Sequence, residues 1–565
     1  MEDKALQMGK TSTVGSFFLL IGVVGSTIIM ALGTLILAGL LSDAELGLYG
    51  IVLIPSTTIA FFRDLGVNSA MTQRIASLRA ANKTSEIQDV IFAGLIFEIL
   101  SGILLALTCF VIANPLAILL NRPDASSLIA LMSVSIFASA IVSAASAIFI
   151  GFEKMKLNSF TQIFQALIKT LLGPLLVFLG FSVLGAVLGL VVSITAGGLI
   201  SIILVYFALF RPLHKAKTTK CNVTQTLMPL LKYGVPLTLS NIVVGVLPQI
   251  FTFFMALYAS DGIMGNYFAA MYFSVFVTFI SFPISTALFP AFSKLNPEKE
   301  SELIKTVFSS SVKYTSILLI PTTMLIITLS TPIVHTLFPQ DGLQFLSPNG
   351  ILQFLFTTNT TPKFPYAPYF LAISSISNLF VLLGNVSLAA FQTGIGKTKQ
   401  IMKQSLLSLA ISMPFSYGII TYFGTHGGIL SEELTVIGGI MAIMVSIIPG
   451  MVWGLIWAWK NYHVKADFKN SAKIFTSTII ASITTYIFIT HFNASYPILL
   501  LTGALLFLFI YLTTTPLIGA INYTDIENLK QMSQGLSIIS KIINIPLTYM
   551  QKLTKPSNNN QHENP

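Results

Sequence analysis

Long apolar runs alternate with short polar segments from one end of the chain to the other. Each run lasts for about 20 residues, which is the length that an α-helix needs to cross the hydrocarbon core of a membrane. The pattern predicts an all-α polytopic membrane protein with fourteen transmembrane helices. They are expected at 14–41, 49–68, 90–113, 128–150, 160–179, 183–209, 235–258, 266–290, 314–337, 367–392, 404–423, 436–459, 472–489 and 496–517.

The composition of the chain agrees with a lipid-facing exterior. Hydrophobic residues make up 54% of the 565 residues, and charged residues make up only 9%. Soluble domains carry about 25% charged residues, so this chain has too few charges to cover a surface that faces water. The two cysteines, Cys109 and Cys221, support neither a disulfide framework nor a metal site. No cofactor is expected.

The positions of the basic residues orient the predicted bundle. With the N-terminus in the cytoplasm, only Arg122 and Lys363 of the 31 Lys and Arg residues fall in outer segments, and Lys169 falls within a helix. All the others lie on the inner side, as the positive-inside rule requires. We therefore expect a multi-pass protein of the cell membrane with both termini in the cytoplasm. The short basic loops are expected to contact lipid headgroups and not nucleic acid.

A short polar motif occurs twice. The segment LLSDAELGLYG contains Ser42, and YASDGIMGNYF contains Ser260; both have Ser, Asp, Gly and Tyr at the same spacing. The inner segments GFEKMK and GIGKTK, which begin at Gly151 and Gly394, form a second matching pair. Both pairs occupy equivalent places in two successive groups of six predicted helices. Because six is an even number, the groups enter the membrane in the same direction and are parallel repeats.

This repeat predicts the domain organisation. An N-terminal lobe of six helices is expected in residues 1–210 and a C-terminal lobe of six helices in 211–465. Two further helices follow in 466–520, and a cytoplasmic tail occupies 521–565. Two such lobes enclose a cleft, and rocking one lobe against the other opens the cleft to alternate sides of the membrane.

Ionisable residues within the predicted helices are candidates for a substrate cavity, because each costs about 2.5–3.5 kcal/mol at the centre of a bilayer. Lys169 and Glu98 are expected at a similar depth. Two interpretations are open for them. Either Lys169 anchors an anionic group of a substrate and Glu98 is a proton-linked switch, or the two residues form a buried ion pair that holds their helices together.

Arg63 and Asp64 lie near the inner end of the predicted helix 49–68. The second repeat has Ser281 and Phe282 at the matching positions, so the fold itself does not require a charge there. An Arg guanidinium can bind phosphate oxygens in a bidentate manner. Snorkelling of Arg63 to the inner interface, with help from Asp64, explains the pair equally well.

Amide side chains mark one face of the predicted helix 235–258. Asn241, Gly245 and Gln249 are spaced by four residues and so share a broad face. The amides of Asn241 and Gln249 suit the uncharged hydroxyl groups of a substrate, although hydrogen bonds between helices explain them as well. Both residues are included among the candidates for the cavity.

The segment AGLLSDAELGLYGIVLIPSTTIAFFRDLGVNSAMTQRIA resembles the first helical hairpin of the Wzx-type polysaccharide flippases. The resemblance consists of a helix of small residues that ends near Gly39, the turn Gly47-Leu48-Tyr49, the tripeptide Asp64-Leu65-Gly66 and the basic Arg74-Ile75-Ala76. It implies membership of the MOP superfamily, which joins oligosaccharide flippases, the lipid II flippase and MATE multidrug exporters. The implied activity is translocation of a polyisoprenyl-(di)phosphate-linked oligosaccharide from the cytoplasmic to the outer leaflet. The implied partners are this substrate, membrane lipids and glycan-assembly enzymes.

Two other functions remain to be weighed. A cation-coupled, MATE-like multidrug exporter usually has twelve helices and acidic residues in its first two helices, where this chain has only Asp64. A membrane glycosyltransferase or polysaccharide polymerase needs carboxylates on a sizeable outer loop. The predicted outer segments carry no D-x-D motif, so an enzyme is not expected.

Overall fold

The computed structural model describes residues 22–81, 83–211, 223–273, 288, 292–293, 295, 300–339, 362–533 and 538–554. In these parts of the chain the regular elements are helices, apart from an isolated bridge between Pro339 and Pro362. The predicted all-α class is confirmed.

Nine helices within the described ranges are long and apolar enough to cross a membrane. A tenth is added if the pair Ala367–Leu383 and Asn385–Gly394, which is bent by 56°, counts as a single span. One of the nine candidates, Met155–Leu209, contains two of the predicted helices. The polytopic membrane class is therefore confirmed, whereas the total of fourteen spans is not confirmed. Most of the predicted helix 266–290 lies outside the described residues.

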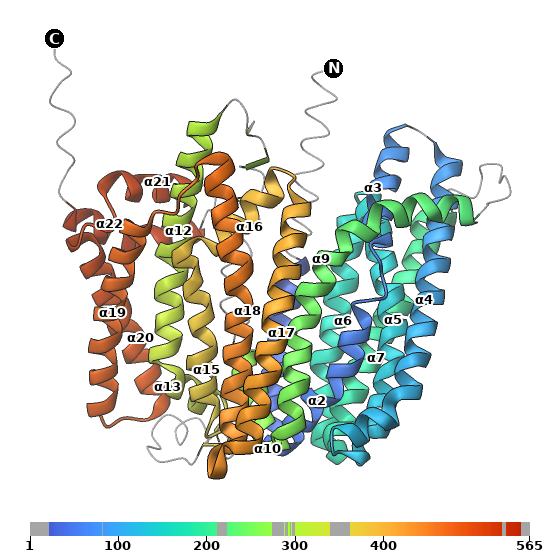
Figure 1. The fold of residues 1–565 in the computed structure, drawn as a ribbon, viewed down its shortest axis with the longest axis horizontal. Coiled ribbons are helices and arrows are strands. Elements are labelled where there is room, and N and C mark those ends of the chain that lie inside the picture. The colour runs from blue at the N-terminus through green and yellow to red at the C-terminus, as the bar shows by residue number, and fades with distance from the viewer. Residues whose placement is uncertain are drawn as a thin grey trace. The chain divides into compact units, whose positions relative to one another are not determined.

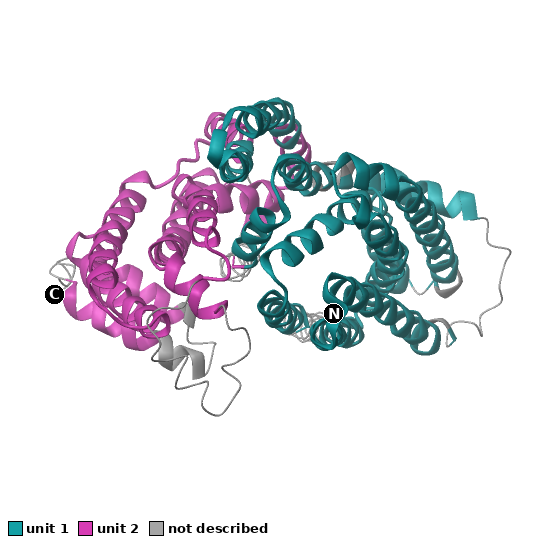
Figure 2. Cartoon of the chain, turned by 90° about the horizontal axis from the view of Figure 1, so that it is seen from below, with its two compact units in different colours: residues 1–272, 405–446 teal, residues 273–404, 447–565 magenta. Residues whose placement is uncertain are grey.

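The chain divides into two compact units (Figure 2). The first contains Met1–Tyr272 and Ser405–Ser446, and the second contains Phe273–Gln404 and Ile447–Pro565. These units group residues by contact, whereas the predicted lobes are defined by repeat symmetry. The division into lobes at residues 210 and 465, with two added helices and a tail, therefore stays a prediction.

The first unit begins with the helix Gly22–Leu40. Its further elements are α2 (Asp43–Ala60), α3 (Val67–Ala80), α4 (Thr84–Leu119), η1 (Pro123–Ala125), α5 (Ser126–Gly151), α6 (Met155–Leu176), η2 (Val177–Phe181), α7 (Ser182–Val205), η3 (Tyr206–Phe210), α9 (Val223–Tyr258), α10 (Asp261–Tyr272) and η6 (Gly428–Leu430). Two long helices, α17 (Thr398–His426) and α18 (Ser431–Tyr462), contribute residues to both units. In Figure 1, α4, α5, α6 and α7 lie side by side, and contacts connect α5 to both α4 and α7.

Glycines allow α6 and α7 to pack as a close antiparallel hairpin. A Cβ atom on Gly189 would collide with the backbone of Gly173, and one on Gly197 would lie 3.2 Å from Gln165. The chain reverses at Gly180, whose φ of 92° is a left-handed conformation that glycine adopts without strain. The predicted helices 160–179 and 183–209 therefore meet at the turn where the sequence placed their ends.

A capping box begins α2. Ser42 Oγ accepts a hydrogen bond from the backbone N–H of Glu45 at 3.2 Å, and Glu45 Oε2 accepts one from the backbone N–H of Ser42 at 2.8 Å. These reciprocal bonds satisfy N–H groups that the first helical turn leaves unpaired. In the second copy of the motif, Ser260 instead donates its backbone N–H to Glu432 at 2.9 Å.

The two copies of the Ser-Asp motif begin α2 and α10, which pack directly against each other. A Cβ atom on Gly47 would collide with the backbone of Asp261, and one on Gly265 would collide with the backbone of Asp43. The contact is therefore reciprocal, and it requires glycine at both positions. Arg122, which lies between α4 and η1, forms an ion pair with Asp261.

The predicted continuous helix 49–68 is wrong, because α2 ends at Ala60 and α3 begins at Val67. Leu65 and Gly66 have φ angles of 45° and 81°, and such left-handed residues end a helix. Gly66 also lies directly against Gly234 of α9, which leaves no room for a Cβ atom. Among the residues of the break, Arg63 is buried in the interior of the unit, whereas Phe61 and Phe62 are exposed.

The second unit consists of long helices and several short ones. They are α12 (Ser301–Thr328), α13 (Ser330–Leu337), α15 (Ala367–Ser375), η5 (Ile376–Leu383), α16 (Asn385–Gly394), α19 (Phe468–His491), α20 (Tyr496–Leu517), α21 (Tyr523–Ser533) and α22 (Ile538–Leu553). The predicted helix 367–392 is thus interrupted, because Gly384 has a φ of 85° where η5 meets α16.

Aromatic packing and a buried ion pair hold this second unit together. The fully buried rings of Phe292, Phe308 and Phe391 contact one another, with centroids 5.4–6.4 Å apart. Lys313 of α12 forms an ion pair with Asp525 of α21 at 2.5 Å. This ion pair therefore connects α21 to α12, which is long and apolar enough to span a membrane.

Candidate functional site

The break between α2 and α3 places Arg63 inside the first unit. Its side chain is only 9% exposed, and its Nε atom lies 3.2 Å from Oε2 of Glu98 on α4, which is completely buried. Nη1 donates to Ser139 Oγ at 2.6 Å, and Nη2 donates to Ser143 Oγ at 2.8 Å. The two serines are four residues apart on α5 and so share one face of that helix. Arg63 therefore joins the α2–α3 break to both α4 and α5.

Asn68 links the two carboxyl groups of this cluster. Its backbone N–H donates to Asp64 Oδ1 at 2.8 Å, and its side-chain Nδ2 donates to Glu98 Oε1 at 2.9 Å. Asp64 thereby satisfies an N–H group in the first turn of α3, where a negative charge is also favoured by the helix dipole. The contact with Glu98 determines the orientation of the Asn68 amide, because the reverse orientation would place two oxygen atoms against each other.

We refer to Arg63, Asp64, Asn68 and Glu98 as the charged cluster. It contains one guanidinium and two carboxyl groups, and its ion pair is shielded from solvent. A buried ion pair is stable only when its remaining donors and acceptors are satisfied. The serine and asparagine bonds satisfy both Nη atoms of Arg63 and Oε1 of Glu98, whereas Nε and Oε2 face each other at 3.2 Å without the geometry of a hydrogen bond. In the described residues, no group of three or more His, Cys, Asp or Glu residues could hold a metal ion.

A cavity of about 420 Å³ adjoins the charged cluster. It lies between the start of α3, the C-terminal half of α5 and the start of α6, and we call it the inner pocket. Polar and charged side chains contribute to its walls together with the apolar residues Val142, Ala147 and Ile150. Its polar lining includes Arg63, Asp64, Asn68, Ser143, Asn158 and Gln162.

Asn158 is the least satisfied polar residue of the inner pocket. Its side chain is 1% exposed, and neither Nδ2 nor Oδ1 has a hydrogen-bond partner among the described residues. Oδ1 of Asn68 is also buried without a partner there. Buried polar atoms are nearly always paired, and each unpaired one costs about 1–3 kcal/mol. The inner pocket therefore has buried amide atoms that remain available for hydrogen bonds.

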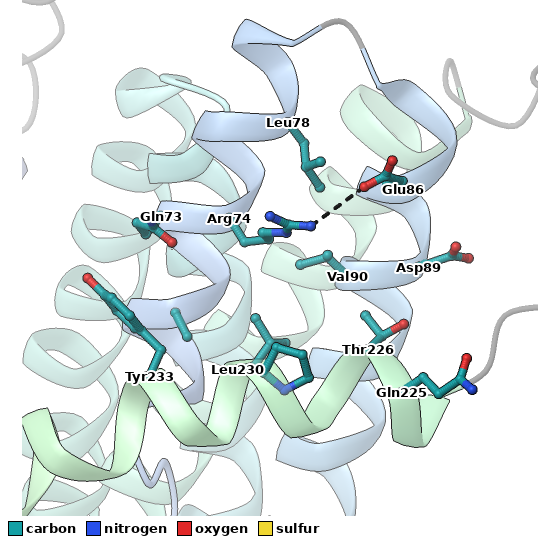
Figure 3. Close-up of a pocket in the computed structure, with 12 residues that line it drawn as sticks. Gln73, Arg74, Leu78, Glu86, Asp89, Val90, Gln225, Thr226, Leu230 and Tyr233 are labelled. Atoms are coloured by element: carbon teal, nitrogen blue, oxygen red, sulfur yellow. Dashed lines mark ion pairs between the residues drawn. The ribbon is translucent and has the colours of Figure 1, made fainter.

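A second cavity, also of about 420 Å³, lies on the other side of α3, between α3, α4 and α9 (Figure 3). Arg74 and Glu86 form an ion pair across it at 3.6 Å, and their side chains are 52% and 41% exposed. Such a solvated pair contributes little to stability.

The structure unites three of the six predicted site residues, namely Arg63, Asp64 and Glu98. Of the two interpretations for Lys169 and Glu98, it contradicts the ion pair, because Glu98 is paired with Arg63; the roles of anchor and switch stay a prediction. A similar depth in the membrane does not determine which face of a helix a residue occupies, and Arg63 reaches Glu98 only because the helix breaks after α2. In the part of the chain that the structure describes, Lys169 has neither an ion-pair nor a hydrogen-bond partner. Arg63 does not extend to the surface either.

The two predicted amides lie on α9. Gln249 Oε1 accepts a hydrogen bond from the Thr57 hydroxyl of α2 at 3.2 Å, which is a contact between helices. The side chain of Asn241 is outside the described residues. The sequence analysis missed Asn68, Ser143 and Asn158, since uncharged polar residues are common in membrane helices and carry no distinctive signal.

Comparison with known proteins identifies the family of this chain. The profile of the family described as "Polysaccharide biosynthesis protein" matches residues 12–296, which is half of the chain. The chain belongs to this family. The resemblance seen in the first helical hairpin is thereby confirmed for this polysaccharide biosynthesis protein. Among curated protein sequences, none matches it significantly.

Solved structures of MOP superfamily transporters share the fold of this polysaccharide biosynthesis protein. The lipid II flippase MurJ, in an inward closed conformation, is 16% identical, with a TM-score of 0.64 over 89% of this chain and 98% of that chain. An inward-facing multidrug resistance MATE family transporter is 16% identical, with a TM-score of 0.60 over 78% of this chain and 96% of that chain. A MOP superfamily transporter from Pyrococcus furiosus is 19% identical, with a TM-score of 0.50 over 80% and 96% of the two chains. These likenesses establish the fold.

Proposed function

We propose that this protein translocates a polyisoprenyl-(di)phosphate-linked oligosaccharide from the cytoplasmic to the outer leaflet by alternating access. The observation that carries this proposal is an inner pocket that presents charged and amide side chains within the apolar helices of a polysaccharide biosynthesis family member. A sugar and its phosphate groups cannot cross hydrocarbon without hydrogen-bonding partners that replace water. The lipid tail can stay in the bilayer while the polar head passes through the protein.

The distribution of Lys and Arg supports a cytoplasmic location for both termini. In this orientation the connection between α5 and α6, beside which the inner pocket lies, faces the cytoplasm. Glycan-assembly enzymes that build the saccharide on the cytoplasmic leaflet are the partners that this topology implies.

The charge balance of the site assigns different roles to its cations. Arg63 is neutralised by Glu98 and held by two serine hydroxyls, so its role is to organise the pocket. Lys169 has no carboxylate partner within the described residues, and an uncompensated ammonium inside a membrane helix is suited to a phosphate group. We assign the contact with the diphosphate to Lys169, and further contacts with the sugar to Asn241 and Gln249.

Deletion of the gene tests this function directly. The deletion strain should lose the surface glycan and accumulate lipid-linked oligosaccharide in the inner leaflet, and the wild-type protein should restore display. Accessibility of the oligosaccharide to a lectin in right-side-out and inverted membrane vesicles distinguishes the leaflets. Normal glycan display in the deletion strain contradicts the proposal, and a new sensitivity to several drugs with unchanged glycan supports a multidrug exporter instead.

A further inference from the structure

Four buried polar atoms on residues that line the inner pocket have no hydrogen bond among the described residues. One of them, Arg63 Nε, faces Glu98 Oε2 at 3.2 Å in the ion pair, so three uncharged atoms are left without any partner there. Asn158 offers one donor, Nδ2, and one acceptor, Oδ1, while Asn68 offers a second acceptor, Oδ1. The set does not depend on the orientation of the Asn158 amide, because both of its polar atoms are unpaired. For Asn68, the bond from Nδ2 to Glu98 leaves the oxygen as the free atom. A ligand that pairs with all three atoms must therefore supply two hydrogen-bond donors and one acceptor.

A phosphate group does not meet this requirement. An ionised phosphate has only acceptor oxygens, so it could pair with Asn158 Nδ2 but would face the two amide oxygens without a proton to share. The charges oppose it as well. Arg63 already has Glu98 as its counter-ion, and Asp64 adds a second carboxyl group to the pocket wall. An additional anion beside this ion pair would meet an excess of negative charge.

We propose that the inner pocket binds the uncharged sugar part of the lipid-linked substrate, and that Asn158 and Asn68 recognise its hydroxyl groups. This inference rests on the proposed function. Each hydroxyl group donates one hydrogen bond and accepts up to two. Two adjacent hydroxyls of a sugar ring therefore satisfy all three unpaired atoms. The cavity of about 420 Å³ lies in the range of small-molecule sites, about 300–1,000 Å³. The diphosphate then lies outside the pocket.

Asn158→Leu separates recognition from folding. Leucine has the same branched shape and the same number of side-chain heavy atoms but no polar atom, and the adjoining cavity has room for its larger methyl groups. The substitution removes a buried, unsatisfied amide and should leave the melting temperature of the protein equal or higher. We expect transport of the lipid-linked oligosaccharide to fall at least about tenfold, because the sugar loses two hydrogen-bonding partners. Gln88→Leu is the matched control. Gln88 is 6% exposed and has an unpaired Nε2 atom, but it does not line the inner pocket. Transport that survives Asn158→Leu as fully as it survives Gln88→Leu overturns the proposal.

Photo-crosslinking identifies which part of the substrate occupies the pocket. The full-length protein carries Ile150→p-benzoylphenylalanine on the apolar wall of the pocket, or Phe160→p-benzoylphenylalanine as a control. Phe160 lies on α6, outside the pocket lining, and its ring is 51% exposed. Cells that produce each variant are labelled with tritiated glucose or with radioactive phosphate and then illuminated. Mild acid is used to hydrolyse the bond between the sugar and the diphosphate in the captured adduct.

Sugar label that stays on the Ile150 variant after acid treatment supports the proposal. Phosphate label that stays while the sugar is released overturns it, and so does capture no greater than that of the Phe160 variant. Failure of the broader function gives a different result, since the wild-type protein would then not restore glycan display in the deletion strain. A restored display with phosphate capture at Ile150 contradicts only the assignment of the pocket.

Discussion

Breaking the ion pair between Arg63 and Glu98 should destabilise the first unit strongly. Arg63→Met leaves the fully buried Glu98 without a counter-charge and removes two hydrogen bonds to serine. Glu98→Gln keeps an oxygen for Asn68 but leaves the guanidinium unpaired. Removal of one partner from a buried pair costs about 3–5 kcal/mol, much of which is the cost of the charge that remains.

The double variant should therefore be less damaged than the two single changes predict together. With both charges removed, the remaining loss is chiefly the two bonds from Arg63 to serine, about 1.5–3 kcal/mol each for a charged donor. We expect a coupling energy of about 2 kcal/mol or more, measured as a double-mutant cycle of unfolding free energies in detergent micelles. Lys169→Met combined with Glu98→Gln is the matched control and should be additive. Additive losses for Arg63 and Glu98, or coupling only for Lys169, would refute the assigned pair.

Three further predictions test other parts of the structure. Gly47→Ala should lower the melting temperature, because its Cβ atom would collide with the backbone of α10. Gly25→Ala, whose Cβ atom meets nothing within 4 Å, is the control and should not lower it. Equal melting curves would contradict the close packing. Lys169→Met should leave the melting temperature unchanged but abolish glycan display, and Lys169→Arg should retain it; full display in Lys169→Met would exclude this residue as the phosphate anchor. Lys313→Met removes the partner of Asp525, so proteolysis should cut near α21 several-fold faster in detergent, and an unchanged cleavage rate would argue against that attachment.

The amino-acid sequence alone determined the class of this protein and most of its helices. In lipid every backbone N–H and C=O must be paired within its own segment, so an apolar run of sufficient length becomes a helix whatever its neighbours are. The choice of Arg63, Asp64 and Glu98 as candidates also followed from the sequence, because charges inside such runs are rare and costly. The first hairpin was distinctive enough to indicate the family.

The partners of these residues depended on the folded chain. The sequence suggested a similar depth for Lys169 and Glu98, but it did not reveal how each helix is rotated about its axis. For this reason Lys169, and not Arg63, was considered as the partner of Glu98. The left-handed conformations of Leu65 and Gly66 turn Arg63 toward α4, and this break has no counterpart in the hydropathy of the segment. Asn158 became a candidate only when the packing of α3, α5 and α6 enclosed it beside a cavity. An uncharged amide gains its meaning from the atoms that surround it, and these come from helices that are distant in the sequence.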